Sequence, residues 1–284
     1  MIDIIISYDI VIVNIRGRRW ESMRKVNLRK NAIMRMLSVN DSLKFDELVK
    51  NLNVSEATIR RTLVKLEEEE KIIRTHSGVK LFYPKPSIYL FNKKSSINIE
   101  QKIAIGKAAA KLVESNEVVF LDSGTTVLRV AEAVTLRVKS EQLKNLTVIT
   151  NSIAVAEVLG DYCKMILLGG RIRLYRKDVC GPLVEKNIKI FRAHKAFIGA
   201  DGLTLEEGLM TTDEYTSKID EEMINRSEQA ILVADSTKFN MPSFLSYAHL
   251  KDIDICITDK GIDEQVKNEY EARGVKIIVA ETNI

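Results

Sequence analysis

The chain of 284 residues is too long for a single small module and suits one large domain or two ordinary ones. With 45% hydrophobic and 29% charged residues, it can bury a sizeable core and stay soluble. The net charge of +4 is unevenly divided: residues 1–90 carry 17 Lys and Arg against 11 Asp and Glu, whereas residues 91–284 carry 26 against 28. A basic first third on a mildly acidic body indicates a polyanionic partner for that third.

Cysteine and histidine are few and scattered. The three cysteines lie far apart with no C-x-x-C pair, which argues against a disulfide framework and a cysteine-rich zinc site and fits a reducing cytoplasm. They are Cys163, Cys180 and Cys256. The three histidines are equally dispersed, so we expect no metal site and no cofactor.

The first 22 residues differ from the rest of the chain. The stretch IDIIISYDIVIVNI (Ile2–Ile15) is apolar, but it is short and Asp3 and Asp9 interrupt it, so it does not predict a membrane span. Basic residues follow this stretch rather than precede it, which is the wrong order for a secretory signal. An extra strand is one interpretation. Our preferred hypothesis is that Met23 is the physiological start and that residues 1–22 are a non-native extension or a disordered tail.

Residues 23–83 predict three helices and a hairpin. Apolar residues recur at near-helical spacing up to Leu37, and a polar stretch then breaks the pattern. The sequence KFDELVKNL (Lys44–Leu52) predicts a second helix, and NVS (Asn53–Ser55) predicts a tight turn. Ser55 is then a suitable N-cap for a third helix, SEATIRRTLVKLEEEE.

The third helix has two different faces. Ile59, Leu63 and Leu66 form an apolar stripe that should dock on the first two helices. The opposite face is basic and bears hydroxyls, and such side chains suit guanine edges and phosphates in a major groove. Together with Ser55, the residues of this DNA-contacting face are Ala57, Thr58, Arg60, Arg61 and Lys65. The sequence alone does not explain the four glutamates that follow, Glu67–Glu70.

A hairpin follows the third helix. The stretch IIRTHSGVKLFY (Ile72–Tyr83) alternates well enough for two strands around a turn at His76, Ser77 and Gly78. A hairpin beside a recognition helix is a wing, and basic side chains on it are placed to contact backbone phosphates. These side chains are Arg74, His76 and Lys80.

The segment from the second helix to the wing resembles a known family. LVKNLNVSEATIRRTLVKLEEEEKIIRTHSGV resembles the DNA-binding signature of DeoR-type bacterial regulators, whose helices read V-S-x-x-T-I-R-R-D-L and whose wings read R-x-H-G-G-A. Thr62 stands in place of the usual Asp, and Ser77 in place of the usual first Gly. Serine tolerates a positive φ poorly at a wing tip. Both arginines remain, so the resemblance implies binding to a double-stranded DNA operator.

A linker and a second domain follow the wing. Residues 84–96 begin with two prolines and end in a polar joint, as expected of a linker. In residues 97–284, β-branched apolar runs alternate with helical stretches such as IEQKIAIGKAAAKLVES (Ile99–Ser115), which indicates a parallel sheet covered on both faces. The predicted strands are Glu117–Asp122, Leu146–Thr150, Lys164–Gly170, His194–Ala200, Gln229–Asp235, Asp254–Asp259 and Val275–Ala280.

Polar residues collect where these strands end. DSGTT (Asp122–Thr126) follows the first strand and opens a helix, and its glycine, backbone N–H groups and hydroxyls suit an anion. Four further strands end in TNS (Thr150–Ser152), GGR (Gly169–Arg171), GADG (Gly199–Gly202) and ADSTKF (Ala234–Phe239). Because ligands of such sheets bind beyond the carboxyl ends of the strands, this set predicts a site for a phosphorylated polar ligand.

The same strings extend the resemblance to the effector domain of DeoR-type regulators, over roughly Ile99–Asp259. That domain is similar in fold to ribose-5-phosphate and glucosamine-6-phosphate isomerases, and the resemblance implies that it binds a phosphorylated sugar. The expected fold class is α/β, with an N-terminal winged helix-turn-helix domain and a larger domain with a mostly parallel sheet. By this resemblance the phosphate is held by Ser123, Gly124, Thr125 and Thr126, next to Asp122. The sugar pocket is lined by Asn151, Gly170, Arg171, Asp201, Lys238 and Asp213 or Glu214.

The sequence leaves three functions open. The first is a cytoplasmic transcriptional repressor of carbohydrate-metabolism genes whose operator binding responds to a sugar phosphate. The second is an aldose–ketose isomerase with a DNA-binding appendage, since the pocket carboxylates and Lys238 are residue types that can supply a base and an electrophile. The third is a constitutive DNA-binding protein with an inactive pocket. We favour the first, because sensing explains the fusion most simply. We therefore expect no enzyme activity, no membrane partner and a homo-oligomer matched to repeated half-sites.

Overall fold

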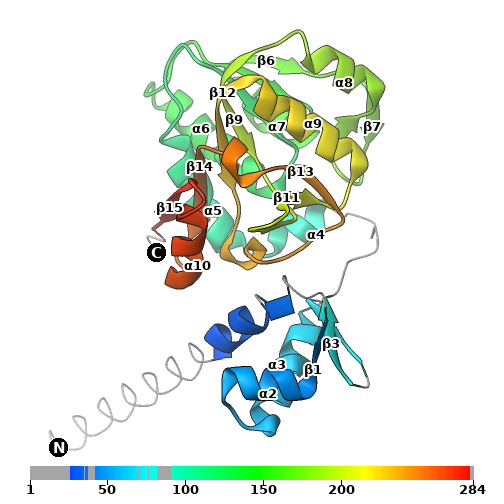
Figure 1. Cartoon of the computed structure of the whole chain (residues 1–284). Coiled ribbons are helices and arrows are strands. Elements are labelled where there is room, and N and C mark those ends of the chain that lie inside the picture. Colours follow the sequence, from blue (N-terminus) through cyan, green and yellow to red (C-terminus); the bar gives the residue numbers. More distant parts are fainter. Residues whose placement is uncertain are drawn as a thin grey trace, which may run out of the picture. The chain divides into compact units, whose positions relative to one another are not determined.

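The computed structural model describes residues 26–34, 36–37, 42–69, 71–75, 77–81 and 91–281. The chain divides into two units, Met1–Tyr83 and Pro84–Ile284, each of which is described by itself (Figure 1). The expectations for residues 1–22, for His76 and for the linker up to residue 90 lie outside the described residues. Within the described ranges, no helix is both long and apolar enough to cross a membrane.

The first unit is a winged helix-turn-helix. Residues 26–34 and 36–37 are helical. The elements that follow are β1 (Ser42–Lys44), α2 (Phe45–Leu52), α3 (Glu56–Glu68), β2 (Ile72–Arg74) and β3 (Gly78–Leu81). The three strands form an antiparallel sheet in the order β1-β3-β2, and β2 and β3 form the wing. The predicted second and third helices and the predicted hairpin are confirmed.

The apolar stripe predicted for α3 forms the core of this unit. Ile59, Leu63 and Leu66 are buried, together with Ile33 and Leu48 from the two preceding helices. Burying side chains of this size contributes about 1.5–3 kcal/mol each, whereas an isolated helix of this length is marginal in water. Packing of the stripe, rather than helix propensity, therefore stabilises α3.

No sequence pattern predicts strand β1. It is three residues long and only Leu43 is buried, so no alternation is visible in the sequence. The strand runs so close to β3 that a Cβ on Gly78 would lie 2.0 Å from the carbonyl oxygen of Leu43. Glycine is required at this position because the neighbouring backbone occupies the space of a side chain.

The second unit is built on a seven-stranded sheet in which every neighbouring pair is parallel. The strand order is β15-β14-β12-β9-β4-β5-β6. The strands are β4 (Val118–Leu121), β5 (Thr147–Thr150), β6 (Lys164–Leu167), β9 (Ala193–Ile198), β12 (Ser227–Val233), β14 (Ile255–Asp259) and β15 (Lys276–Ala280). All seven correspond to predicted strands, and the predicted parallel sheet is confirmed.

Helices cover both faces of this sheet (Figure 1). They are α5 (Ile99–Ala110), α6 (Thr125–Lys139), α7 (Ile153–Leu159), α8 (Pro182–Ile188), α9 (Glu214–Asn225) and α10 (Glu264–Glu271). Alternate residues of β4 point to opposite faces. Val119 and Leu121 join the apolar cluster of α5, α6 and α7, whereas Phe120 joins the cluster of α8, α9 and α10. Because both faces are buried, the strands read as continuous apolar runs.

The strand order reverses at β4. Strands β5 and β6 lie on one side of β4, and β9, β12, β14 and β15 lie on the other. The carboxyl ends of β4 and β9 therefore flank a topological switch point, which is the usual ligand position in open parallel sheets.

Shorter elements precede β4 or lie between the main strands, and the sequence predicts none of them. They are α4 (Phe91–Ser96), β7 (Arg171–Arg173), β8 (Asp178–Cys180), β10 (Gly202–Thr204), β11 (Gly208–Thr211), β13 (Leu245–Ala248), and the 3₁₀ turns η1 (Ser236–Lys238) and η2 (Leu250–Asp252). Strands β7 and β8 form a hairpin, and β10, β11 and β13 form a small antiparallel sheet.

Candidate functional site

The outer face of α3 and the wing carry the side chains predicted to contact DNA. Those described as exposed or half-buried are Ser55 at the N-cap of α3, Ala57, Thr58, Arg60, Arg61 and Lys65 on α3, Arg74 on β2 and Lys80 on β3. The Arg60 guanidinium lies 4.4 Å from the centre of the Phe45 ring, yet its side chain is 67% exposed. Arg61 Nε donates to the Ala57 carbonyl oxygen at 3.3 Å. Both guanidinium groups remain accessible from outside the unit.

The start of α3 differs from the expected cap in one respect. Ser55 occupies the N-cap position with extended backbone, but its side chain makes no capping bond. Its hydroxyl instead shares a hydrogen bond of 2.9 Å with the Thr58 hydroxyl. Thr62, one of the two departures from the family pattern, is buried and donates to the Thr58 carbonyl oxygen at 2.8 Å. This threonine therefore satisfies its hydroxyl within the helix.

The glutamates at the end of α3 bind basic residues of the same unit. Glu67 accepts hydrogen bonds from Nε of Arg74 at 2.6 Å and from its backbone N–H at 3.2 Å, which lowers the pKa of Glu67. The Glu69 carboxylate pairs with Lys30 of the first helix and lies 3.4 Å from the Lys71 ammonium. These contacts join α3 to the wing and to the first helix. The predicted phosphate contact of Arg74 therefore has to use guanidinium N–H groups other than Nε–H, or the ion pair with Glu67 has to open.

A polar cavity lies in the second unit at the switch point between β4 and β9. It encloses about 580 Å³ of space that protein atoms do not fill, part of it open to solvent. The residues predicted as effector-binding that line it are Asp122, Ser123, Gly124, Thr125, Thr126, Asp201 and Lys238. They come from three strand ends that are adjacent in the sheet, those of β4, β9 and β12.

Asp122 shapes this crevice. Its two carboxylate oxygens accept hydrogen bonds from the backbone N–H groups of Gly124 and Gly199, the latter at 2.6 Å. The carboxylate thereby ties the end of β4 to the end of β9. Burial raises the pKa of Asp122 to about 6, although both N–H bonds favour the charged form.

The N-terminus of α6 opens into the cavity. Gly124 is its N-cap, and Ser123, Thr125 and Thr126 flank the cap in the cavity wall. Within the part of the chain that the structure describes, the side-chain hydroxyls of these three residues have no hydrogen-bond partner. Unpaired N–H groups at the start of a long helix, together with free hydroxyls, are donors that suit a phosphate.

Three lysines give the cavity a cationic wall. Lys94 comes from α4, Lys102 from α5 and Lys238 from η1. Lys102 is only 5% exposed, and its ammonium donates to the Lys94 carbonyl oxygen at 2.7 Å. Burial lowers the pKa of Lys102 to about 8, although nearby Asp235 favours the charged form. A buried ammonium gains strongly from an anionic ligand, which compensates for lost hydration.

Asp201 faces these lysines. It accepts hydrogen bonds from the Lys94 ammonium at 3.2 Å and from the backbone N–H and hydroxyl of Thr212 at 3.0 and 2.8 Å. Burial alone would raise the pKa of Asp201, but Lys94, Lys238 and the bonds from Thr212 hold it well below its usual range. The ionised carboxylate therefore positions Lys94 at the edge of the cavity.

The structure does not bring five of the predicted effector-binding residues to the cavity: Asn151, Gly170, Arg171, Asp213 and Glu214. Strand order explains the first three, because β5 and β6 lie one and two positions from β4 on the side away from β9. At about 4.8 Å per strand, their ends are roughly 5 and 10 Å farther along the sheet. The β7–β8 hairpin packs there, and Asn151 Nδ2 donates to the Val179 carbonyl oxygen at 3.1 Å.

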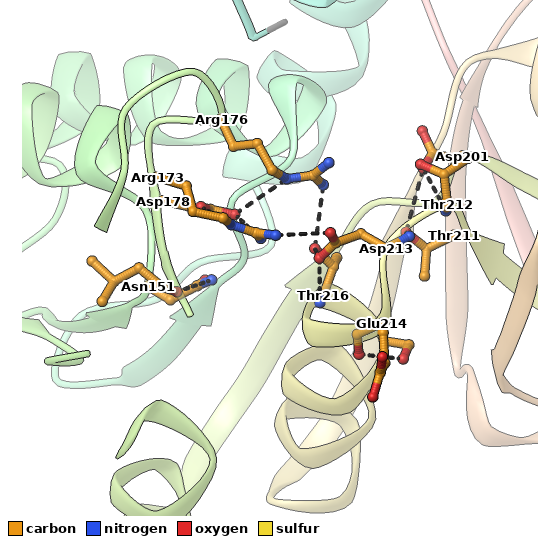
Figure 2. A network of polar contacts seen from close by, with 12 residues as sticks. Asn151, Arg173, Arg176, Asp178, Asp201, Thr211, Thr212, Asp213, Glu214 and Thr216 are labelled. Carbon is orange, nitrogen blue, oxygen red and sulfur yellow. Dashed lines mark hydrogen bonds and ion pairs between the residues drawn. The ribbon is translucent and has the colours of Figure 1, made fainter. Parts of the chain in front are cut away.

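Asp213 and Glu214 take part in other contacts (Figure 2). Arg173 of β7 donates to Asp213 at 2.7 Å and to the two carboxylate oxygens of Asp178 at 2.9 and 2.6 Å. Asp213 also caps α9 by accepting from the Thr216 backbone N–H at 2.9 Å. Glu214 is exposed in the first turn of α9. The Asp213 carboxylate therefore joins the β7–β8 hairpin to α9 instead of facing the cavity.

Six further residues line the cavity that the sequence analysis does not name: Lys94, Lys102, Arg176, Thr211, Thr216 and Asp220. For two of them, the sequence contains a pattern that could have identified them. Lys102 lies on the same face of α5 as Ile105 and is a charge on an otherwise apolar stripe. Asp220 stands three residues before buried Met223 of α9 and gives the same signal. The others reach the cavity through tertiary contacts that local patterns do not encode.

Comparison with known proteins identifies both units. The family model of the DeoR-like helix-turn-helix domain matches residues 29–84, and that of the DeoR C terminal sensor domain matches residues 97–260. The HTH-type transcriptional repressor GlcR of Bacillus subtilis is 33% identical over 88% of this chain and 95% of its own length. The lactose phosphotransferase system repressor of Lactococcus lactis is 31% identical over 85% of this chain and 94% of its own length.

Solved structures show a more distant likeness. Ribose 5-phosphate isomerase A of Methanocaldococcus jannaschii is 18% identical, with a TM-score of 0.38 over 50% of this chain and 55% of the isomerase. A likeness at this level does not bear on function.

Proposed function

This chain belongs to the DeoR family of helix-turn-helix transcriptional regulators, and we propose that it represses carbohydrate-metabolism genes under the control of a phosphorylated sugar bound in the cavity. One observation carries the proposal. The cavity combines the open N-terminus of α6 and three hydroxyls that have no hydrogen-bond partner among the described residues with the buried Lys102 and with Lys238. These are donors and cations for a phosphate, placed at the switch point of a parallel sheet.

The operator would be bound by the outer face of α3. Arg60 and Arg61 present exposed guanidinium groups for guanine edges or phosphates, and Lys65 lies one turn further along the helix. Lys80 of the wing would add a phosphate contact. A role at an operator implies the cytoplasm, where bacterial DNA is found.

Control by the effector would act through α4. This helix begins at Phe91, ten residues after the end of β3, and supplies Lys94 to the cavity wall. The Lys94 ammonium bonds to Asp201, and an entering phosphate would compete for it. A ligand can shift an equilibrium only by its differential affinity for two states, and this competition is one source of such a difference.

The isomerase interpretation needs a carboxylate base that can approach a carbon-bound proton. Arg173 binds Asp213, and Lys94 and Thr212 bind Asp201, so two of the carboxylates considered for that role are engaged. These contacts favour sensing over catalysis. Incubating the protein with aldose phosphates and assaying for ketose phosphates separates the two functions, because product formed in proportion to protein would establish an enzyme.

A thermal melt tests whether the cavity binds anything. A sugar phosphate at about 100 times its Kd should add about 2.7 kcal/mol to the unfolding free energy. A chain with an inactive pocket would melt unchanged in every sugar phosphate, and the proposed sensing would then be wrong.

We also propose that the protein is a homo-oligomer, because helix-turn-helix proteins commonly bind paired half-sites as dimers. Light scattering after size-exclusion chromatography measures the mass directly. A mass equal to the 32.2 kDa of one chain at the concentrations that bind DNA would contradict this.

A further inference from the structure

Three aspartates line the cavity, of which Asp122 and Asp220 are buried and Asp201 is half-buried, and their hydrogen bonding differs. Asp122 and Asp201 accept hydrogen bonds from backbone, hydroxyl or ammonium donors of the protein. Asp220 of α9 is 2% exposed and lines the same cavity. Within the described residues no donor is hydrogen-bonded to its carboxyl group.

A buried polar group without a partner is uncommon and costly, so the position of Asp220 at the cavity wall is informative. The charged groups that act most strongly on it are Asp122, Arg176 and Asp201. Burial comes first among the causes that raise the pKa of Asp220 well above its usual range, and the acidic neighbours add to it. A neutral carboxyl group both donates and accepts a hydrogen bond, and a sugar hydroxyl does the same.

Asp220 and the three cavity lysines come from different elements of the chain. It shares a face of α9 with Thr216, four residues earlier, whose hydroxyl accepts a hydrogen bond from Arg176 at 3.3 Å. The lysines come from α4, α5 and η1 instead. A ligand whose phosphate is held by those lysines and by the start of α6 leaves its hydroxyl groups to the other residues of the cavity wall, and Asp220 is one of them.

We propose that Asp220 exchanges hydrogen bonds with a hydroxyl group of the effector, and so determines which phosphorylated sugar is bound. This inference rests on the proposed function, because it requires a sugar phosphate in the cavity. Asp220 is a binding residue that selects among ligands of the same charge.

The test compares full-length wild type with Asp220→Ala and Asp220→Asn by isothermal titration. The probes are inorganic phosphate, a panel of aldose and ketose phosphates, and deoxy analogues of the tightest binder. Glu221→Gln is the control, since Glu221 is an exposed acid on the same helix. Asp220→Ala should weaken the tightest sugar phosphate about 5- to 100-fold, the factor for loss of two hydrogen bonds between neutral groups, one donated and one accepted. Asp220→Asn keeps a donor and an acceptor and should stay within about threefold of wild type.

Two controls separate a role of Asp220 in ligand recognition from a structural role. Inorganic phosphate should bind all four proteins alike. The ligand-free Asp220→Ala variant should melt no lower than wild type, because no described residue donates a hydrogen bond to the carboxyl group. For one deoxy analogue, removing the hydroxyl group should weaken binding to wild type as much as Asp220→Ala weakens binding of the intact sugar phosphate. The Asp220→Ala variant should bind that deoxy analogue almost as well as it binds the intact sugar phosphate.

The outcomes are distinct. If sugar phosphates bind wild type and Asp220→Ala equally well, the role of Asp220 is wrong while the proposed function stands. If no sugar phosphate binds wild type, both are wrong. If wild type converts an aldose phosphate to a ketose phosphate and Asp220→Asn does not, Asp220 is a catalytic base and this inference is overturned.

Discussion

Removing Asp178 tests the buried ion network that joins the β7–β8 hairpin to α9. The Asp178 side chain is fully buried and accepts two hydrogen bonds from Arg173, whose side chain is 5% exposed. In an Asp178→Ala variant, Arg173 keeps its bond to Asp213 at 2.7 Å. Removing one partner of a buried pair costs about 3–5 kcal/mol, and the remaining bond to Asp213 places the expected loss at the lower end, about 3 kcal/mol.

This loss converts to a large thermal shift. For a unit the size of Pro84–Ile284 each kcal/mol lowers Tm by about 2–4 °C, so the variant should melt about 6–12 °C below wild type. Circular dichroism melts of the full chain measure the shift. The control is Glu157→Ala, because Glu157 pairs with Lys177 at 3.3 Å but is 59% exposed, and exposed pairs contribute about 0–1 kcal/mol. An Asp178→Ala protein that melts together with the control would refute the reasoning.

Three further predictions concern binding. Replacing Arg60 and Arg61 together by Ala should abolish specific DNA binding in a mobility-shift assay, and normal binding would mean that the recognition face is misassigned. Lys238→Ala should require about 10- to 100-fold more sugar phosphate for the same response while ligand-free DNA binding persists; an unchanged response would remove Lys238 from the site. Raising the pH from 7 to 9 should weaken sugar-phosphate binding in calorimetric titrations, because Lys102 loses its proton near pH 8. The phosphate keeps both of its negative charges over this range, since its second pKa is about 6. Lys102→Met should flatten that profile; an equally steep decline in this variant would exclude Lys102 as the titrating group. Without ligand, the same change in pH should stabilise the protein through Lys102. The pKa of Lys102 is about 8 in the folded chain and about 10.4 in the unfolded chain, so its contribution to the unfolding free energy rises between about pH 8 and 10.

The sheet could be predicted from the sequence because each strand is buried on both faces and reads as an apolar run. The same patterns identify where each strand ends, and thus the polar segment Asp122–Thr126 that opens α6. They carry no information on which strands are neighbours. Because β9 and not β5 continues the cavity from β4, Asp201 and Lys238 face the ligand space, whereas Asn151 and Arg171 do not.

The rest of the site depends on contacts between elements distant in sequence. Lys94 lies on a six-residue helix whose position is set by tertiary packing, and Phe91 of that helix is buried against α6. Asp220 and Lys102 are charges on buried helix faces, which a helical-period analysis of α5 and α9 could have flagged. The glutamates that end α3 become intelligible only when Arg74 and Lys30 are brought beside them.

The central claim is that a phosphorylated sugar in the cavity controls DNA binding, and one titration tests it most directly. Fluorescence anisotropy of labelled DNA from upstream of this gene would be followed as protein is added at fixed salt, with and without each member of a panel of sugar phosphates. The account predicts that one sugar phosphate shifts the binding curve of wild type and that Lys238→Ala shows a much smaller shift at the same concentration. A wild-type curve that binds this DNA tightly and is moved by none of the sugar phosphates would contradict the account.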